Sequence, residues 1–491
     1  MLKEGKIVMG PDASGADVWI EPKLANRHGI ISGGTGSGKT VTLKAMAESF
    51  SDLGVPVFLS DVKGDIGGMV KDRMHPANFW DIYGKNGIPL RTTISEMGPL
   101  LLGRILDLSD VQKSVLSVVF KIADDENLLL IDTKDLKSML AYVAEKSKEY
   151  ELTYGKLSSQ SLTAITRAIV ALESEGGDIF FGEPALSVQD WISVDTNGKG
   201  MLNILDASSL INSPKLYSTF LLWMLSELFE ILPEVGDLEK PKMIFFFDEA
   251  HLMFKDAPKA LVDKIEQVVK LIRSKGVGVY FCTQNPKDIP DGVLAQLSNK
   301  IQHNLSAYTP ADQKAVKAIA QSFPVNEEFD TYETILNLGI GEAVVSFLEE
   351  NGVPSKAKKI KVTMPESAKN SLDVSERDGM VKGSILYGKY ATAVDNESAY
   401  EFLMRRGAQA AADMEEQKQL AAAEKEKQKA DKQAASAKKR AVKSVGNTAA
   451  GTIGRELGKE VGKNFGSFGK RLGGNLGASL GRGILSTLLK M

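Results

Sequence analysis

The 491-residue sequence predicts an α/β fold built around a buried, largely parallel sheet. Short and nearly continuous apolar runs, typical of fully buried strands, recur along the chain. Stretches with apolar residues at helical spacing lie between most of these runs. The first complete unit has the order strand, glycine loop, helix and strand, which indicates parallel strands in one sheet.

The predicted strands fall within the first 350 residues. They span residues 5–10, 16–22, 27–33, 55–61, 200–208, 242–250, 276–285, 300–306 and 341–348. A mainly helical stretch from about 100 to 195 is too long for a simple crossover, so we expect a helical insertion or subdomain there. The predicted parts are an α/β domain over 1–365, its extension over 366–410, a charged helical linker over 411–443 and a basic Gly-rich tail over 444–491.

The net charge of −3 is unevenly distributed. Residues 411–491 contain 16 Lys and Arg against 8 Asp and Glu, a surplus of 8, which leaves −11 for residues 1–410. Only the tail therefore has the basic character of a nucleic-acid footprint. Its glycines recur at four-residue spacing, which places small residues on one helical face. We weigh a disordered solubilising tail against peripheral membrane contact and against packing between copies.

The sequence argues against disulfides, a histidine-built metal site and a membrane span. Cys282 is the single cysteine, and the four histidines lie far apart without ligand spacing. No stretch of 18 uninterrupted apolar residues occurs. We therefore expect a cytoplasmic protein in a reducing compartment.

A glycine-rich segment, GGTGSGKT at residues 33–40, fits the phosphate-loop pattern G-x-x-x-x-G-K-[ST] between a strand and a helix. Its backbone N–H groups and the helix N-terminus would surround phosphates. Lys39 would reach the β- and γ-phosphates, and the Thr40 hydroxyl would bind Mg²⁺. The predicted nucleotide contacts are Gly33, Gly34, Thr35, Gly36, Ser37, Gly38, Lys39, Thr40 and Val41, with ATP and Mg²⁺ as the ligands.

Two acidic residues follow the apolar run MIFFF at 243–247. At the end of a buried strand, Asp248 can hold Mg²⁺, partly through water, while Glu249 polarises the attacking water. The alternative is that the pair only caps the next helix. Because a phosphate loop lies about 210 residues upstream, the catalytic interpretation is favoured.

The segment RSKGVGVYFCTQN adds two further candidates. Its strand ends at Thr283, so the Gln284 amide would lie beside the acidic strand and could bond both the water and the γ-phosphate. Arg273 ends the preceding helix. Spacing alone favours two roles for Arg273 equally. It is either a surface cation that complements the helix dipole or a guanidinium that contacts the phosphate bound by a neighbouring subunit.

A glutamate that activates water indicates hydrolysis as the reaction itself, and therefore conformational work. A kinase transfers the phosphoryl group to a bound acceptor and has less need of Glu249. A small-molecule kinase is accordingly disfavoured by Glu249 and Gln284 together.

Several motifs in order closely resemble the HerA-like branch of the HerA–FtsK ATPases, nearest to the bacterial YjgR-type group. The motifs are NRHGIISGGTGSGKTVTLK, SDVKGD, RTTISEMGP, DEAHLMF, IRSKGVGVYFCTQNP and GKYATAVDNESAYE. The resemblance covers about residues 1–405. It implies a RecA-like core and a hexameric ring with nucleotide sites between subunits. In HerA relatives, ATP hydrolysis drives translocation along double-stranded DNA.

The resemblance also implies roles for individual residues. Lys39 and Thr40 match the phosphate and Mg²⁺ ligands, and Asp248 and Glu249 match the Mg²⁺-site acid and the catalytic glutamate. Gln284 matches the sensor, and Arg273 matches the arginine supplied in trans. A family motif beside the site contains Asp61, Lys63 and Asp65, for which capping by the aspartates is the alternative role.

Two departures from the family pattern are visible. HerA has an N-terminal β-barrel that docks the nuclease NurA, whereas the phosphate loop here begins at residue 33, so we expect no such docking barrel. In the YjgR-type group the strand at 300–306 is richer in arginine, whereas this chain has Lys300 and Ser306.

The leading hypothesis is a ring ATPase that translocates duplex DNA. Against it stand the −11 charge of residues 1–410 and the lack of a basic, aromatic stripe of the kind that binds single strands. Lys255 and Lys259 are candidate pore-loop cations, although solvated surface lysines are the simpler explanation. The alternative is a motor or assembly ATPase acting on protein or on a membrane-associated secretion complex, docked through the basic tail.

Overall fold

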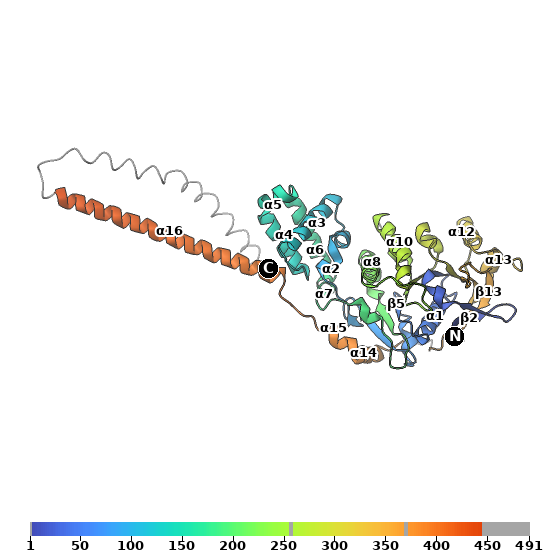
Figure 1. Cartoon of the computed structure of the whole chain (residues 1–491). Helices are drawn as coiled ribbons and strands as arrows, with labels where there is room; N and C mark the ends of the chain where they lie inside the picture. The colour runs from blue at the N-terminus through green and yellow to red at the C-terminus, as the bar shows by residue number, and fades with distance from the viewer. Residues whose placement is uncertain (1, 255–258, 368–371, 444–491) are drawn as a thin grey trace. The chain divides into compact units, whose positions relative to one another are not determined.

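Ten strands form the central sheet in the order β13-β12-β11-β4-β10-β9-β5-β8-β6-β7. Figure 1 shows the chain as a cartoon in which β5 and β13 of this sheet are labelled. The computed structural model describes residues 2–254, 259–367 and 372–443. The strands from β11 to β7 run parallel, and β12 and β13 pair antiparallel at one edge. The strands are β4 Gly29–Ser32, β5 Val57–Asp61, β6 Ala77–Asp81, β7 Ile88–Pro89, β8 Leu202–Asp206, β9 Met243–Phe247, β10 Val277–Thr283, β11 Asn299–Gln302, β12 Glu342–Ser346 and β13 Lys358–Lys361. This arrangement confirms the predicted α/β class.

A second, antiparallel sheet is formed by the N-terminal residues. It consists of β1 Leu2–Lys3, β2 Lys6–Pro11 and β3 Asp17–Ile20, of which the last two correspond to predicted strands. The register of β2 on β3 shifts between Val8 and Gly10, which indicates a bulge.

The chain divides into two compact units. Unit 1 comprises residues 1–108 and 170–395, and unit 2 comprises residues 109–169 and 396–491. Unit 1 contains the sheet and the helices α1 Lys39–Asp52, α2 Ile94–Ile105, α7 Gly177–Phe180, α8 Pro214–Ile231, α9 His251–Phe254, α10 Lys259–Ile272, α11 Asp291–Leu294, α12 Pro310–Gln321, α13 Thr331–Leu336, α14 Val374–Gly383 and α15 Ile385–Tyr390. Short 3₁₀ turns, η1 Pro22–Arg27, η2 Gly67–Val70, η3 Val188–Trp191, η4 Ser208–Asn212, η5 Arg273–Lys275 and η6 Pro286–Asp288, connect them.

Unit 2 is helical. Its helices are α3 Asp110–Asp125, α4 Thr133–Glu145, α5 Ser147–Tyr154, the first part of α6 Ser159–Ser174, and α16 Ala399–Lys443. Capping boxes at Ser109 and Asp132 begin α3 and α4. Glu126 accepts hydrogen bonds from Tyr142 and Arg406, which joins the start of α16 to the inserted helices.

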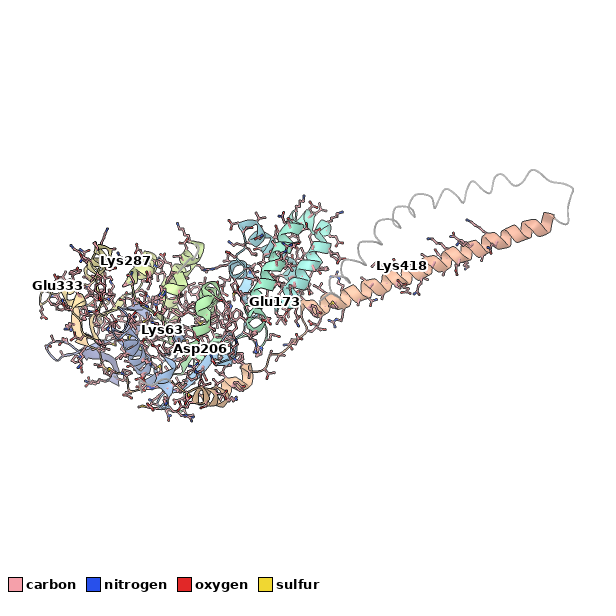
Figure 2. The ribbon with its side chains drawn as sticks, turned by 180° about the vertical axis from the view of Figure 1, so that it is seen from behind. Lys63, Glu173, Asp206, Lys287, Glu333 and Lys418 are labelled. Atoms are coloured by element: carbon pink, nitrogen blue, oxygen red, sulfur yellow. The ribbon has the colours of Figure 1, made fainter. Side chains whose placement is uncertain are left out.

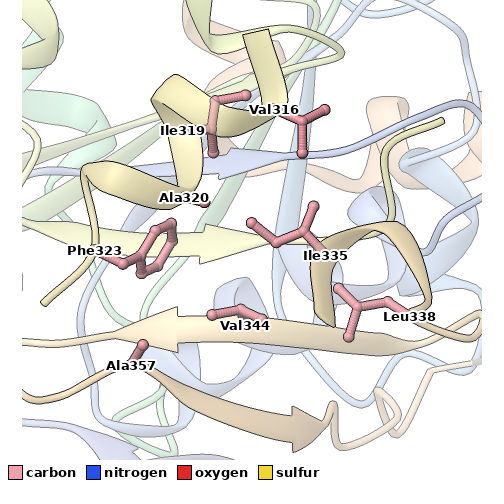
Figure 3. Close-up of a cluster of buried hydrophobic side chains, with 8 residues drawn as sticks. All are labelled: Val316, Ile319, Ala320, Phe323, Ile335, Leu338, Val344 and Ala357. Atoms are coloured by element: carbon pink, nitrogen blue, oxygen red, sulfur yellow. The ribbon is translucent and has the colours of Figure 1, made fainter. Parts of the chain in front are cut away.

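The phosphate loop is placed by the first strand–helix–strand unit. All four residues of β4 and all five of β5 are buried, which their apolar composition requires. The helix α1 begins at Lys39, immediately after the loop, and buries Phe50 against Phe246 and Tyr280. The helices α12 and α13 and the strand β12 enclose an apolar cluster (Figure 3). This cluster consists of Val316, Ile319, Ala320, Phe323, Ile335, Leu338, Val344 and Ala357.

Some predicted boundaries differ from the structure. The helices of the predicted 100–195 stretch run from Ile94 only to Phe180, because Gly182 and Pro184 follow in extended or turn conformations. The strand predicted over 300–306 ends at Gln302, because the next residues bend beneath the phosphate loop. There His303 N donates to Ser32 O and Asn304 O accepts from Gly34 N. The predicted division into four parts stays a prediction.

The charged segment predicted over 411–443 lies within α16, whose side chains from residue 415 to 433 are exposed. The Gly-rich tail, for which membrane contact was weighed, lies outside the described residues. None of the helices formed by the described residues combines the length and apolar character needed to span a bilayer.

Candidate active site

Four neighbouring parallel strands bring the predicted site residues to one edge of the sheet. In the order β4, β10, β9 and β5, the carboxyl ends of these strands lead into Gly33, Gln284, Asp248–Glu249 and the 61–67 loop. Ligands of open α/β sheets bind beyond the carboxyl ends of the strands. The sheet order therefore assembles, from segments up to about 250 residues apart, one candidate site for a nucleotide.

Glycine is required at two positions of the phosphate loop. Gly38 has φ +116°, a conformation that side chains rarely tolerate, and at Gly33 a Cβ would lie 2.6 Å from His303 Cβ. His303 is buried beneath the loop and contacts Thr42 Oγ1 through Nε2 at 2.9 Å and Glu342 O through Nδ1 at 2.8 Å. These contacts fix the floor of the loop, and local sequence patterns give no signal for them.

Lys39 lies at the centre of the loop. Its Nζ donates to Gly33 O at 2.7 Å and to Gly34 O at 2.9 Å, so the loop's own carbonyls hold the ammonium. Burial lowers the pKa of Lys39. Thr35 and Gly36 are exposed, whereas Ser37 is buried and Thr40 and Val41 are half-buried. An ammonium buried at this point suits a phosphate anion that replaces the carbonyls.

Asp248 is the residue that fits the expected Mg²⁺. Its side chain is buried, and among the residues that the structure describes no hydrogen-bond donor reaches its Oδ2. Burial first, and then the Glu249 charge, raise the pKa of Asp248 to about 7. A buried carboxylate oxygen without a partner is costly unless a cation or a proton compensates it. Asp248, together with the Thr40 hydroxyl, is therefore a suitable donor set for Mg²⁺.

Glu249 adopts an uncommon backbone conformation, with φ +46°. Non-glycine residues in this region are costly and cluster at functional sites. Its carboxylate forms an ion pair with Lys63 and accepts a hydrogen bond from Gln284 Nε2 at 3.2 Å. His251 Nδ1 lies 3.2 Å from Oε2. Burial opposes ionisation of Glu249, but Lys63 and then Gln284 outweigh it and lower the pKa, so Glu249 is a carboxylate at neutral pH.

Gln284 connects the carboxylate to the phosphate loop. Its Oε1 accepts from Thr35 Oγ1 at 3.3 Å while its Nε2 donates to Glu249. The amide therefore contacts the exposed tip of the loop and the candidate base at once. The sequence predicted the strand end that carries Gln284, but gave no indication of the Thr35 contact.

Asp61 organises the loop that carries Lys63. Its two carboxylate oxygens accept backbone N–H groups of Gly64, Asp65, Ile66 and Gly67 at 2.7–3.1 Å. Burial raises the pKa of Asp61 to about 6, against the effect of these donors. The neighbouring Arg377 of α14 pairs with Asp206 at 2.9 Å. Asp61 therefore fixes the backbone of the 61–67 loop, which carries Lys63 (labelled in Figure 2).

Arg273 and Lys300, both singled out in the sequence, lie away from this edge. Arg273 is exposed and precedes β10, so the seven residues of that strand, about 20 Å, separate it from Gln284. Lys300, early in β11, donates to Ser322 O at 2.7 Å, and Ser306 is exposed. Of the two candidate pore lysines, Lys259 is exposed at the start of α10, and Lys255 lies outside the described residues. Because the length of β10 separates Arg273 from Gln284, Arg273 cannot contact phosphates bound at the loop of its own chain.

A family of known proteins matches nearly the whole chain. The family described as "Helicase HerA-like C-terminal" matches residues 6–74 and 70–490. The "DNA double-strand break repair helicase HerA" of Sulfurisphaera tokodaii is 25% identical over 365 residues, which is 70% of this chain and 67% of that protein. The "DNA import protein CedB" of Sulfolobus acidocaldarius is 23% identical over 339 residues, 68% of this chain and 52% of that protein. The matched segments thus span between about half and two thirds of these relatives.

Solved structures show the same fold. The conjugative coupling protein TrwB, in its trigonal form with sulphate, superposes with a TM-score of 0.52 at 16% identity, over 75% of this chain and 91% of TrwB. VirB4 of Thermoanaerobacter pseudethanolicus superposes with a TM-score of 0.50 at 17% identity, over 74% of this chain and 97% of VirB4. These similarities confirm a RecA-like P-loop architecture for the sheet and its helices.

Proposed function

The chain belongs to the helicase HerA-like family of P-loop ATPases, and we propose that it is an ATP-hydrolysing ring motor that translocates along duplex DNA. The observation that carries the proposal is the convergence of Lys39, Asp248, Glu249 and Gln284 on one sheet edge. The names of the HerA and CedB relatives, which concern DNA repair and DNA import, support DNA as the track. The finer assignment to the YjgR-type group stays a prediction.

The reaction that suits this site is hydrolysis of the γ-phosphoryl group. Glu249 takes the proton of a water molecule whose oxygen bonds to phosphorus, and the bridging bond to the β-phosphate breaks with its electron pair leaving on ADP. Lys39 and the loop N–H groups would hold the phosphates, and Gln284 would orient the water. Bound Mg²⁺, held by Thr40 and Asp248, would neutralise charge that develops on the phosphate oxygens.

The ring part of the proposal rests on Arg273. Arg273 is exposed and precedes the amino end of β10, whereas its own phosphate loop follows the carboxyl end of the parallel strand β4, so Arg273 suits a site on a neighbouring copy. We propose a homo-hexamer in which each nucleotide lies between two subunits.

A second candidate function is favoured by the charge distribution. Residues 1–410 carry a net charge of −11, which would repel a polyanion such as DNA. The same motor could instead act on protein or on a membrane-associated secretion complex.

Steady-state ATPase rates with and without duplex DNA, over a salt series, test the proposal. We expect DNA to accelerate hydrolysis at low salt and the stimulation to fall steeply with salt, because phosphate contacts release counterions. Glu249→Gln serves as the inactive control. Basal hydrolysis that depends on Glu249 but is indifferent to DNA at low salt would favour the second candidate. Sedimentation with a non-hydrolysable ATP analogue tests the hexamer.

A further inference from the structure

Lys63 forms an ion pair with Glu249, the candidate catalytic base. Its ammonium pairs with Glu249 Oε1, the oxygen that also accepts from Gln284 Nε2. Glu249 is almost completely buried, whereas 42% of the Lys63 side chain is exposed. A carboxylate paired with an ammonium is a weaker base than a free one, so this pair must open before Glu249 can take a proton from water.

The Lys63 backbone is fixed, but its side chain is not. Asp61 holds the 61–67 loop through four N–H groups, whereas the half-exposed lysine stem retains rotational freedom. Lys63 also lies within electrostatic range of Lys39 and of Asp248, so its ammonium is close to the residues that would hold the phosphates and Mg²⁺.

We propose that Lys63 is a positioning residue that exchanges the Glu249 carboxylate for the terminal phosphate of a bound nucleoside triphosphate, and so frees Glu249 for water. This inference rests on the proposed hydrolytic function. The exchange makes the base available only when a terminal phosphate is present. A diphosphate, which ends before this position, leaves the Lys63–Glu249 pair closed.

The exchange predicts an energetic coupling between the two side chains. If Lys63 must leave Glu249 to bind the triphosphate, the apparent affinity is reduced by the fraction of closed pairs. Glu249→Gln weakens the pair and frees Lys63. The same substitution also removes a negative charge near the phosphate, an effect that persists without Lys63. A double-mutant cycle separates these two contributions.

The experiment is isothermal titration calorimetry with ADP and with a non-hydrolysable imido analogue of ATP, in the presence of Mg²⁺. We expect Lys63→Met to weaken binding of the analogue about tenfold and to leave ADP binding unchanged. We expect Glu249→Gln to tighten binding of the analogue about fivefold with Lys63 present and less than twofold in the Lys63→Met background. Lys71→Met is the matched control, since Lys71 pairs with Glu376 at 3.4 Å, away from Glu249, and should change neither affinity.

Two results would overturn the exchange. One is an equal effect of Glu249→Gln in both backgrounds. The other is that Lys63→Met weakens ADP and analogue binding alike. Either result, in a chain that binds the analogue and hydrolyses ATP, rejects the role of Lys63 and leaves the motor proposal standing. Failure of the unmodified chain to bind either nucleotide rejects both.

Discussion

Gln284 Nε2 lies 3.2 Å from Glu249 Oε1, and the other end of the same amide accepts from Thr35 of the phosphate loop. One neutral side chain thus joins the loop that would bind phosphates to the carboxylate that would activate water. This relationship depends on β10 lying between β4 and β9 in the sheet.

Removing the Gln284 side-chain amide should lower the rate of hydrolysis without weakening nucleotide binding. We expect Gln284→Ala to lower kcat for ATP about a hundredfold, because one positioned donor is lost from the site. The affinity for the non-hydrolysable analogue should change little, since the loop N–H groups and Lys39 remain. Single-turnover hydrolysis and calorimetry measure the two quantities. A variant that binds the analogue poorly but turns over normally once saturated would contradict this role.

Arg273 should act on a neighbouring copy. We expect Arg273→Ala and Lys39→Ala each to abolish hydrolysis, and an equimolar mixture of the two to recover roughly a quarter of the activity, since random mixed rings pair an intact Lys39 with an intact Arg273 at that frequency. Steady-state ATPase after subunit exchange measures the recovery.

Lys275→Ala is the control for Arg273, because Lys275 lies in the same 3₁₀ turn. It should retain full activity. A mixture no more active than its components would show that Arg273 does not complement in trans.

The 61–67 loop should depend on the charge of Asp61. In the unmodified chain the backbone N–H groups of this loop donate to the Asp61 carboxylate. Asp61→Asn replaces one carboxylate oxygen with an N–H₂ group, which cannot accept them, so we expect the free energy of unfolding to fall by about 2 kcal/mol or more. Urea unfolding followed by tryptophan fluorescence measures this, because all four tryptophans belong to unit 1. Asp65→Asn, at an exposed position of the same loop, should have little effect. Equal losses of stability in the two variants would show that the backbone hydrogen bonds to Asp61 do not stabilise the loop.

Acid should destabilise unit 1 through His28. Burial lowers the pKa of His28 to about 4, and its Nδ1 accepts the Val279 N–H, which requires the neutral ring. The unfolded chain binds a proton near pH 6.5 and the folded chain does not, so stability is lost as pH falls from about 6.5 to 4. At pH 5 the loss from this residue is on the order of 2 kcal/mol.

His28→Asn keeps a side-chain acceptor for the Val279 N–H and cannot take up a proton in this pH range. The variant should therefore lose about 2 kcal/mol less than the parent between pH 7 and pH 5, measured by urea midpoints at the two values. An identical pH dependence in both proteins would assign the acid sensitivity to other groups.

The sequence predicts the site more completely than it predicts the sheet. The strands before Gly33, Asp248 and Gln284 are apolar throughout, so their carboxyl ends could be located and expected to meet. By contrast, β13 consists of the residues KKIK with one buried side chain, a pattern typical of an exposed loop, and it was missed. The strand β6 was missed because Asn78 and Asp81 interrupt its apolar residues, and β7 was missed because it has only two residues, Ile88 and Pro89.

Contacts between distant side chains were beyond prediction for a different reason. Lys63 and Glu249 are 186 positions apart, and Thr42 and His303 are 261 apart. Such pairs depend on strand order and on rotamers, which periodicity does not encode. The motif containing Lys63 pointed to the right edge of the sheet but not to its partner.

Unit 2 is made from two separate stretches of chain, so three covalent crossings connect it to unit 1, at residues 108–109, 169–170 and 395–396. A single peptide-bond cleavage at 108–109 or at 169–170 leaves each part of unit 2 covalently attached to a part of unit 1, whereas cleavage at 395–396 cuts residues 396–491 from the rest of the chain. Limited proteolysis at either of the first two crossings should therefore change the denaturing gel pattern without releasing unit 2. Complete separation of the two units therefore requires cleavage at all three crossings.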